Sequence, residues 1–453
     1  MRTLCAMAVV GAAVGSILPM SPLVAQAGPM MDHTMAGGAD HPMLVVPLGS
    51  WSLVGMAQLF PVVTIGAPGG DESDPVRSTE WYLTQPALMT NLESPGQRVV
   101  LRTTFNFEGI TQEDGELAFG GWGEGFLDKR HPHTLLHEAM LSVNAWSVGS
   151  GDLSFSGGKG FAPYGTDDPM SRPGLKYPTN HHLSQILERW TINGVWRTAA
   201  WSVEAGVFSG NEPEGPSDLS NVDGFGRSWS ARLARRFGGG MEGDGRAWEL
   251  SASYGRVVET HDGARETTRL VNGAARMEGA AGAGTLYALV EASHGRPDHG
   301  AERFSVLGEL AWTTGRHRPY VRFEEARRPE YARLGPSTSD AYFTYDHDDD
   351  PIGTTRWSIT TFAYAVDATP GKVSVRPFVE AQHHRVRADR GGVEPEALFG
   401  SGSFWSISLG ARVFLGGGPM RMGRYGVLDA MTEMTRGAAA GGAMMHGAHG
   451  GAR

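Results

Sequence analysis

The sequence repeats one pattern, in which apolar and polar side chains alternate over stretches of about ten residues. Trp201, Val203 and Ala205, for example, alternate with Ser202 and Glu204. Successive side chains of a β-strand point to opposite faces, so the pattern predicts strands with one apolar and one polar face. The candidate strands are 99–108, 135–146, 153–158, 190–196, 201–207, 229–237, 248–254, 266–277, 285–293, 304–313, 318–325, 357–366, 373–383 and 405–415.

Two further features distinguish a membrane barrel from a soluble β-protein, whose strands also alternate. The apolar faces repeatedly begin or end with Trp, Tyr or Phe, as the aromatic girdles of membrane barrels do. The opposite faces carry charge in the middle of the strand, as at Arg102 and Glu309, which suits a wet lumen. Closing the sheet also removes the unpaired edges that lipid does not tolerate. We therefore predict a transmembrane antiparallel β-barrel of about 14–16 strands, with a secreted β-protein as the alternative.

The N-terminus has the features of a secretory signal peptide. Arg2 precedes the apolar run 4–18, and Ala-Gln-Ala at 25–27 matches a cleavage site of the A-x-A type. The apolar run is too short for a membrane-spanning helix. We expect 1–27 to be removed on export, which leaves a mature chain without Cys5, the only cysteine. Export and a membrane barrel together predict the outer membrane of a Gram-negative bacterium.

The rest of the chain divides into three parts. Residues 28–47 form a Met/His-rich leader that we expect to be flexible, 48–415 is the barrel, and 416–453 is a tail rich in Gly, Ala, Met and His. Within the barrel, 66–96 holds many Pro, Gly and acidic residues and is expected to be irregular. The candidate extracellular loops are 159–185, 209–227, 326–353 and 386–402.

The tail is predicted to be mostly mobile. Three consecutive glycines and then Pro419 follow the last candidate strand, and the composition buries too little apolar surface to offset chain entropy. The patch 424–436 is expected to form at most a short helix. If it packs anywhere, the periplasmic mouth of the barrel is nearest, where Val427, Leu428 and Met431 would act as a partial plug.

Charged residues on the predicted lumen face define the candidate pore. Opposed Arg and Glu rows create a transverse field that orients polar solutes. We therefore expect a porin-like channel for passive diffusion of small polar or ionic solutes, and the alternative is that these charges pair and fill a closed barrel. The net charge of -10 and the lack of a dominant basic patch argue against a nucleic-acid partner, so outer-membrane lipid and the solute are the expected partners. The pore-lining candidates are Arg102, Lys159, Arg189, Glu204, Arg232, Glu249, Glu309, Arg322, Arg376, Glu380 and Arg412.

Residues 158–165 are Gly-Lys-Gly-Phe-Ala-Pro-Tyr-Gly, and a loop then leads to Ile-Leu-Glu-Arg at 186–189. This stretch resembles the phosphate-selective porin family of Gram-negative outer membranes. The resemblance implies a homotrimer of sixteen-stranded barrels, each with a loop folded into its pore, and it places Lys159 and Arg189 near the constriction. The chain departs from the family in having only four lysines and in having its last strand away from the C-terminus.

Methionine and histidine concentrate at both ends of the chain. Thioether and imidazole groups are good copper ligands, and Met favours Cu(I). Residues 31–35, Met-Asp-His-Thr-Met, resemble the repeats in the leaders of outer-membrane copper-resistance barrels. An outer-membrane copper-binding or resistance protein is therefore the alternative function, and no other cofactor is expected. The candidate ligands are Met31, His33, Met35, His41, Met43, His446 and His449.

The sequence carries no recognisable catalytic motif. G-x-S-x-G, H-E-x-x-H and the Walker pattern are absent, and the Gly-rich stretches are expected in turns and strands, not before a helix as a Rossmann pattern requires. The acidic stretch 346–350 lacks the ligand spacing of an EF-hand and is interpreted as a solvated loop. The chain is therefore predicted not to be an enzyme, with a barrel that carries an active site at its rim, or an adhesion barrel, as the remaining alternatives.

A first prediction tests the assignment of the two strand faces. Val203 is expected to face lipid, so Val203→Arg near the middle of the membrane should lower the free energy of unfolding by about 2–4 kcal/mol. Glu204 is expected to face water, so Glu204→Gln should leave the free energy of unfolding nearly unchanged. Urea titration of the folded variants measures both, and the reverse order would mean that the faces are assigned wrongly.

Overall fold

The computed structural model describes residues 43–66, 78–111, 134–175, 178–179, 181–213, 217–219, 222–238, 246–261, 263–330, 353–368, 373–391, 394–396, 401–417, 421–433 and 435.

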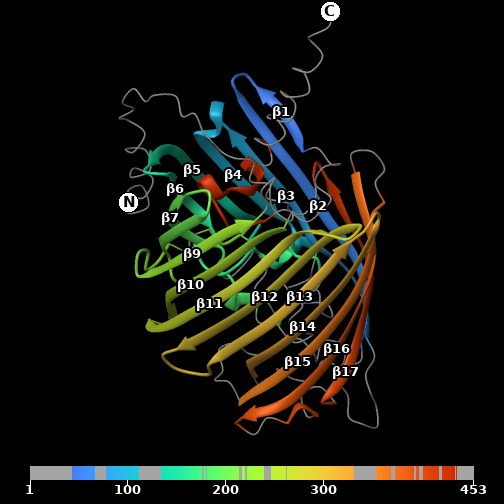
Figure 1. The fold of residues 1–453 in the computed structure, drawn as a ribbon. Helices are drawn as coiled ribbons and strands as arrows, with labels where there is room; N and C mark the ends of the chain where they lie inside the picture. Colours follow the sequence, from blue (N-terminus) through green and yellow to red (C-terminus); the bar gives the residue numbers. More distant parts are fainter. Residues whose placement is uncertain are drawn as a thin grey trace, which may run out of the picture.

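Each strand from β2 to β16 pairs antiparallel with the next, and β17 pairs back with β2, so these sixteen strands close into a barrel (Figure 1). The described strands are β1 (Leu44–Leu48), β2 (Trp51–Gly66), β3 (Ser78–Glu93), β4 (Val99–Asn106), β5 (Leu136–Val148), β6 (Gly151–Gly160), β7 (Arg189–Arg197), β8 (Trp201–Phe208), β9 (Ser228–Gly238), β10 (Arg246–His261), β11 (Ala264–Ala281), β12 (Gly284–Pro297), β13 (Arg303–Thr313), β14 (His317–Glu330), β15 (Gly353–Val366), β16 (Val373–Arg390) and β17 (Ser403–Leu415).

The barrel closes at a seam where two strands share one edge of β2. β17 pairs with 57–66 of β2, and the short strand β1 pairs with 51–55, so the two lie end to end along that edge. Gly416, at the junction, has a φ of 78°. A Cβ atom there would lie 2.7 Å from both the Gly55 carbonyl oxygen and the Leu44 side chain, so the junction requires glycine.

The outer face of the barrel is apolar, and the alternation that predicted its strands is confirmed. On β8, Trp201, Val203 and Val207 are exposed on the outside, whereas Ser202 and Glu204 point inward and are buried. Aromatic side chains ring both ends. At the end with short turns the exposed ones include Trp146, Trp201, Phe237, Trp248, Trp312 and Tyr364. At the end with long connections they include Trp81, Phe105, Trp229, Phe323 and Trp405.

An apolar band between two aromatic girdles is the lipid-facing surface of an outer-membrane barrel. The protein is therefore a transmembrane β-barrel of the Gram-negative outer membrane. Among the residues that the structure describes, no helix is long and apolar enough to span a membrane.

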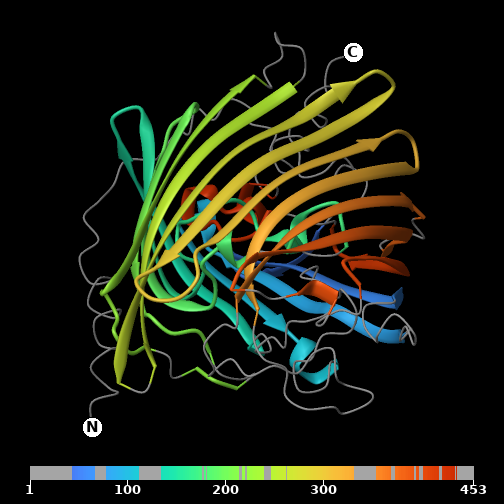
Figure 2. The same cartoon turned by 90° about the horizontal axis from the view of Figure 1, so that it is seen from below.

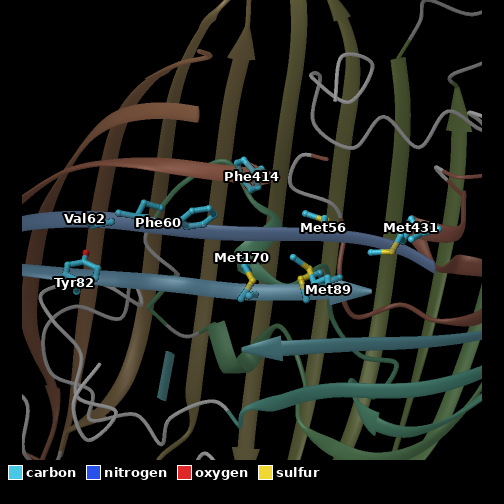
Figure 3. Packing of buried hydrophobic residues seen from close by; sticks show 12 residues of the cluster. Met56, Phe60, Val62, Tyr82, Met89, Met170, Phe414 and Met431 are labelled. Atoms are coloured by element: carbon cyan, nitrogen blue, oxygen red, sulfur yellow. The ribbon is translucent and has the colours of Figure 1, made fainter. Parts of the chain in front are cut away.

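The expectation that 66–96 is irregular is wrong, because most of it is β3. β2 and β3 escape recognition because their inward faces mix large apolar side chains with polar ones, which weakens the alternation. That inward face forms a buried cluster with side chains from elsewhere in the chain (Figure 3). The labelled members are Met56, Phe60 and Val62 of β2, Tyr82 and Met89 of β3, Phe414 of β17, and Met170 and Met431.

Several strands extend further than the sequence pattern indicates. β1 takes up the last four residues of the predicted flexible leader 28–47 and ends at Leu48. β14 continues to Glu330 and β16 to Arg390, so the connections expected at 326–353 and 386–402 begin later. The reason is that the hydrogen-bonded ladder continues past the lipid band, where the outward side chains are polar and no alternation remains.

Two segments enter the barrel (Figure 2). The loop insert, 161–188, connects β6 and β7, and the C-terminal insert, 421–435, follows β17. The expectation of a mostly mobile tail is wrong for 421–433, where every described residue except the last is buried. The chain is ordered there because the lumen offers both the apolar cluster of β2 and β3 and charged partners. Residues 1–42 and 436–453, including the predicted signal peptide, lie outside the described residues.

Candidate functional site

The predicted pore-lining residues all point into the barrel, and all are buried. The exposed fraction of these eleven side chains is at most 8%. Their role as the lining of an open pore therefore remains a prediction. In the structure several of them instead hold the two inserts, and others pair with each other on the wall.

Arginines of the C-terminal insert form an ionic network with the wall and the loop insert. The Arg421 Nη2 atom lies 2.7 Å from Glu249 Oε1 on β10, and its Nε atom lies 2.8 Å from both carboxylate oxygens of Asp167. Arg424 donates to the same Glu249 oxygen at 2.9 Å. Arg276 of β11 also pairs with Asp167. Three guanidinium groups around two carboxylates thus join both inserts to the wall.

Asp429 fixes the far part of the C-terminal insert. Its Oδ2 atom lies 2.7 Å from Arg102 Nε on β4, and its Oδ1 atom accepts a hydrogen bond of 3.0 Å from Asn91 on β3. The backbone N–H of Thr432 donates to Oδ1 at 2.9 Å. Asp429 therefore caps the helical turn at 430–433 while it neutralises a buried arginine of the wall.

The two inserts meet at Tyr425. Its hydroxyl donates to Glu138 Oε1 on β5 at 2.6 Å and accepts from the backbone N–H of Phe161 at 2.9 Å. A Cβ atom at Gly160 would collide with this hydroxyl. The Gly-Lys-Gly-Phe sequence that suggested a porin loop therefore provides the space in which the tail packs.

Two predicted pore residues anchor the loop insert. Arg412 of β17 donates to the carbonyl oxygens of Arg172 at 2.9 Å and Gly174 at 2.5 Å. Glu380 of β16 accepts the backbone N–H of Leu175 at 2.8 Å. These contacts satisfy backbone groups that would otherwise be buried without partners.

Lys159 and Arg189, which the porin resemblance places near a constriction, lie at the two ends of the loop insert. Lys159 is fully buried, donates to the Leu136 carbonyl at 2.9 Å, and lies 3.9 Å from Glu188 Oε1. Arg189 pairs with Glu259 at 3.0 Å, and with a further carboxylate at 3.1 Å. Both charges are therefore compensated inside the protein.

Two cavities lie in the described lumen. One cavity of about 50 Å³ is lined by Arg318, Tyr320 and Arg376 among others. A second, of about 10 Å³, lies beside Asp167 and Arg421. Since one water needs roughly 10–15 Å³, the two cavities hold a few waters and no sugar-sized solute.

The copper hypothesis falls mostly outside the described residues. Met43 is within them, and it packs against the apolar cluster of β2 and β3. In the described part of the chain, no group of three or more His, Cys, Asp or Glu side chains is arranged to hold a metal ion. The remaining candidate ligands, Met31, His33, Met35, His41, His446 and His449, and the acidic stretch 346–350 lie outside the described residues.

Sequence reasoning missed Asp167, Arg421, Arg424, Tyr425 and Asp429 as parts of the site. The available signal was the composition of 421–433, in which charged residues alternate with large apolar ones. A segment that stays in water does not need large apolar side chains every few residues. The flanking glycines concealed this signal.

Comparison with known proteins finds a likeness in structure only. No protein family and no curated protein matches the sequence. OmpT, an outer-membrane protein of Vibrio cholerae, is 10% identical, with 82% of this chain and 100% of OmpT covered and a TM-score of 0.44. An anion-selective porin from Comamonas acidovorans is 10% identical over 81% of this chain and 99% of its own, with a TM-score of 0.44. Salmonella typhi OmpF in complex with daunomycin is 10% identical, with 82% of this chain and 100% of OmpF covered and a TM-score of 0.46. At these identities the likeness goes no further than the fold, and none of these three structures is described as phosphate-selective.

The buried state of Glu204 changes the expectation for Glu204→Gln. Its two carboxylate oxygens accept hydrogen bonds of 2.9 and 2.5 Å from Arg232 on β9, and both side chains are buried. Removing one partner of such a pair leaves an uncompensated charge, so the free energy of unfolding should fall by about 3–5 kcal/mol. Urea titration measures the loss. A change smaller than that of a surface substitution such as Arg246→Gln would mean that water reaches Arg232.

Acid should loosen the inserts between about pH 4 and about pH 2. Burial by itself raises the pKa of Asp167, but Arg421, Arg276 and Arg424 lower it from 3.8 to about 2. A carboxylate with a lowered pKa stabilises the fold fully above its ordinary pKa, and this contribution is lost as the pH falls through the folded value. Asp167→Asn should lack this acid step and be less stable at pH 7. Urea midpoints across the range test it, and equal acid steps in both proteins would contradict the assignment.

Proposed function

We propose that this protein is an outer-membrane channel for small polar or ionic solutes, and that the C-terminal insert holds it closed. The supporting observation is that a sixteen-stranded wall is filled by two chain segments attached through ionic and hydrogen bonds. Barrels of 16–18 strands enclose an aqueous channel when nothing occupies them. The barrel is therefore wide enough to conduct, and the inserts are what closes it.

The C-terminal insert is the part suited to move. It follows the last strand of the wall, so its withdrawal breaks no strand pairing. Many of its wall contacts are charged, such as those of Arg424 with Glu249 and of Asp429 with Arg102. Water replaces such partners, whereas it does not replace an apolar core. The loop insert is instead continuous with a wall strand at each end.

Withdrawal would expose a lumen wall of mixed charge. Arg102, Glu138 and Glu249 each lose a partner from the C-terminal insert and gain water. Rows of opposite sign favour polar and zwitterionic solutes over a single class of ion. Passive diffusion requires no catalysis, so no enzymatic activity is proposed. The homotrimer that the porin resemblance implies is testable by sedimentation in detergent.

Copper binding is a second proposal, and it rests on the Met- and His-rich composition of 28–43 and 444–449. Titration of the mature protein with Cu(I), with and without these segments, tests it. Loss of tight binding on their removal would support the proposal, and unchanged binding would contradict it.

Truncation after Gly418 should produce a folded barrel that conducts. Every wall strand ends by Leu415, so heat-modifiable migration in gels should persist. In planar bilayers the intact protein should show rare or small conductance steps, and the truncated protein should show large, stable ones. The reason is that the ionic contacts of 421–433 with the wall are replaced by water.

Two variants control this experiment. Arg421→Gln with Arg424→Gln removes the contacts to Glu249 and should raise the frequency of opening without loss of any chain. Arg246→Gln, at an exposed site on the barrel rim, should behave as the unmodified protein. A folded truncation that does not conduct would mean that the loop insert closes the lumen alone, and the proposed role of the tail would be wrong.

A further inference from the structure

Three arginines stand side by side on the outer face of the barrel. Arg327 on β14 pairs in register with Arg356 on β15, and Arg356 pairs with Arg387 on β16. Residues directly opposite each other on neighbouring strands have side chains on the same face. Their parity matches that of Phe323, which is exposed on the outside, so this arginine row faces away from the lumen.

The arginine row lies beyond the aromatic girdle at the long-connection end. Phe323 precedes Arg327 by four residues on β14, and His383, which pairs with Trp405, precedes Arg387 by four on β16. Four residues of strand span roughly 13 Å. Long connections of outer-membrane barrels face the cell exterior. The row is therefore at the level of the polar headgroups of the outer leaflet.

Two carboxylates of the described residues lie against this row. Asp389 serves two arginines, with its carboxylate oxygens 2.7 Å from Arg327 Nε and 3.4 Å from Arg356 Nη2. Glu325 lies 3.8 Å from Arg356. Arg387 has no carboxylate within 4.0 Å among the described residues.

Arg385 adds a fourth positive charge to the same face. It precedes Arg387 by two residues on β16, pairs in register with Ser358 of β15, and is exposed. Within the described chain it also has no carboxylate partner. Among the described residues, this face thus has four arginines against the two carboxylates of Asp389 and Glu325.

At the same end, every arginine of a second outward row has an acceptor within the protein. Arg256, Arg269 and Arg296 are likewise in register on β10, β11 and β12. Arg269 pairs with Asp298 at 2.7 Å, Arg296 lies 3.5 Å from Glu302, and Arg256 donates to a backbone carbonyl at 2.9 Å. Each of these has an acceptor in the protein, so exposed arginines without a partner among the described residues are not general at this end of the barrel.

We propose that the arginine row, with Arg385, binds the phosphate groups of the glycolipid that forms the outer leaflet of the outer membrane. A guanidinium group binds phosphate through two parallel hydrogen bonds. Neighbouring strands are about 4.8 Å apart, so adjacent guanidinium groups reach one phosphate together. Like charges directly opposite each other destabilise a sheet, and a bound phosphate removes this repulsion. The acyl chains of the same lipid lie against the apolar band that begins at Phe323.

Diphosphoryl lipid A is the probe, added to the full mature protein in detergent micelles and followed by native mass spectrometry. The unmodified protein should bind it at least about tenfold more tightly than Arg356→Gln/Arg387→Gln, because each charge-assisted hydrogen bond contributes about a decade of affinity. Arg269→Gln is the matched control, since its side chain is 49% exposed against 45% for Arg356, and should bind as the unmodified protein does. Asp389→Asn should bind more tightly, because the competing carboxylate is gone.

Dephosphorylated lipid A should bind weakly, and equally to the unmodified protein and the double variant. An equal loss of lipid A binding in Arg269→Gln would mean general electrostatic attraction and would overturn the proposal. Tight binding of dephosphorylated lipid A would overturn it in favour of acyl-chain recognition. Full competition by equimolar inorganic phosphate would mean that the row takes the free ion and not the lipid. If the double variant folds poorly, the gain expected for Asp389→Asn decides the question.

Discussion

The closed ring of backbone hydrogen bonds determines the rest of this structure. An unpaired N–H or C=O in lipid costs several kcal/mol, so β17 must pair with β2 and leave no edge. Closing sixteen strands fixes a diameter that the side chains of the wall do not fill. The interior must therefore hold either water or additional chain. Here 161–188 and 421–435 occupy it, and the polar inner face of the wall becomes their binding surface.

Paired charges hold the inserts in this lumen, and they respond to the loss of a partner differently from an apolar core. A buried guanidinium–carboxylate pair offsets its desolvation cost only while both partners are in place. Loss of one partner, such as Asp429 beside Arg102, leaves one buried and uncompensated charge. Withdrawal of the whole C-terminal insert is different, because water then enters and solvates all the charged groups of the network at once. The same network is therefore sensitive to point substitution and compatible with opening.

The exterior of the barrel could be predicted from the sequence, because lipid acts on every second residue of strands such as β8 and β17. β2 and β3 could not, since inner residues such as Met56 and Met89 pack in the apolar cluster that includes the C-terminal insert, and the inner faces are therefore partly apolar. The inward direction of Arg102 was predictable from its own strand. Its burial was not, because the partner Asp429 lies in a distant tail whose glycines suggested mobility.

The preference for arginine over lysine follows from both surfaces of the wall. Only four of the 39 basic residues are lysine. Inside, Arg232 holds both carboxylate oxygens of Glu204 and the carbonyl of Tyr164 at once, which uses the planar fork of donors. Outside, the same fork matches the oxygens of a phosphate. An ammonium group is a point donor, and it suits Lys159, where the acceptors converge on one position beside β5. Arginine therefore suits positions where one side chain must bind several acceptors. Inside the barrel these acceptors belong to the wall and the inserts, and outside it they are the proposed lipid phosphates.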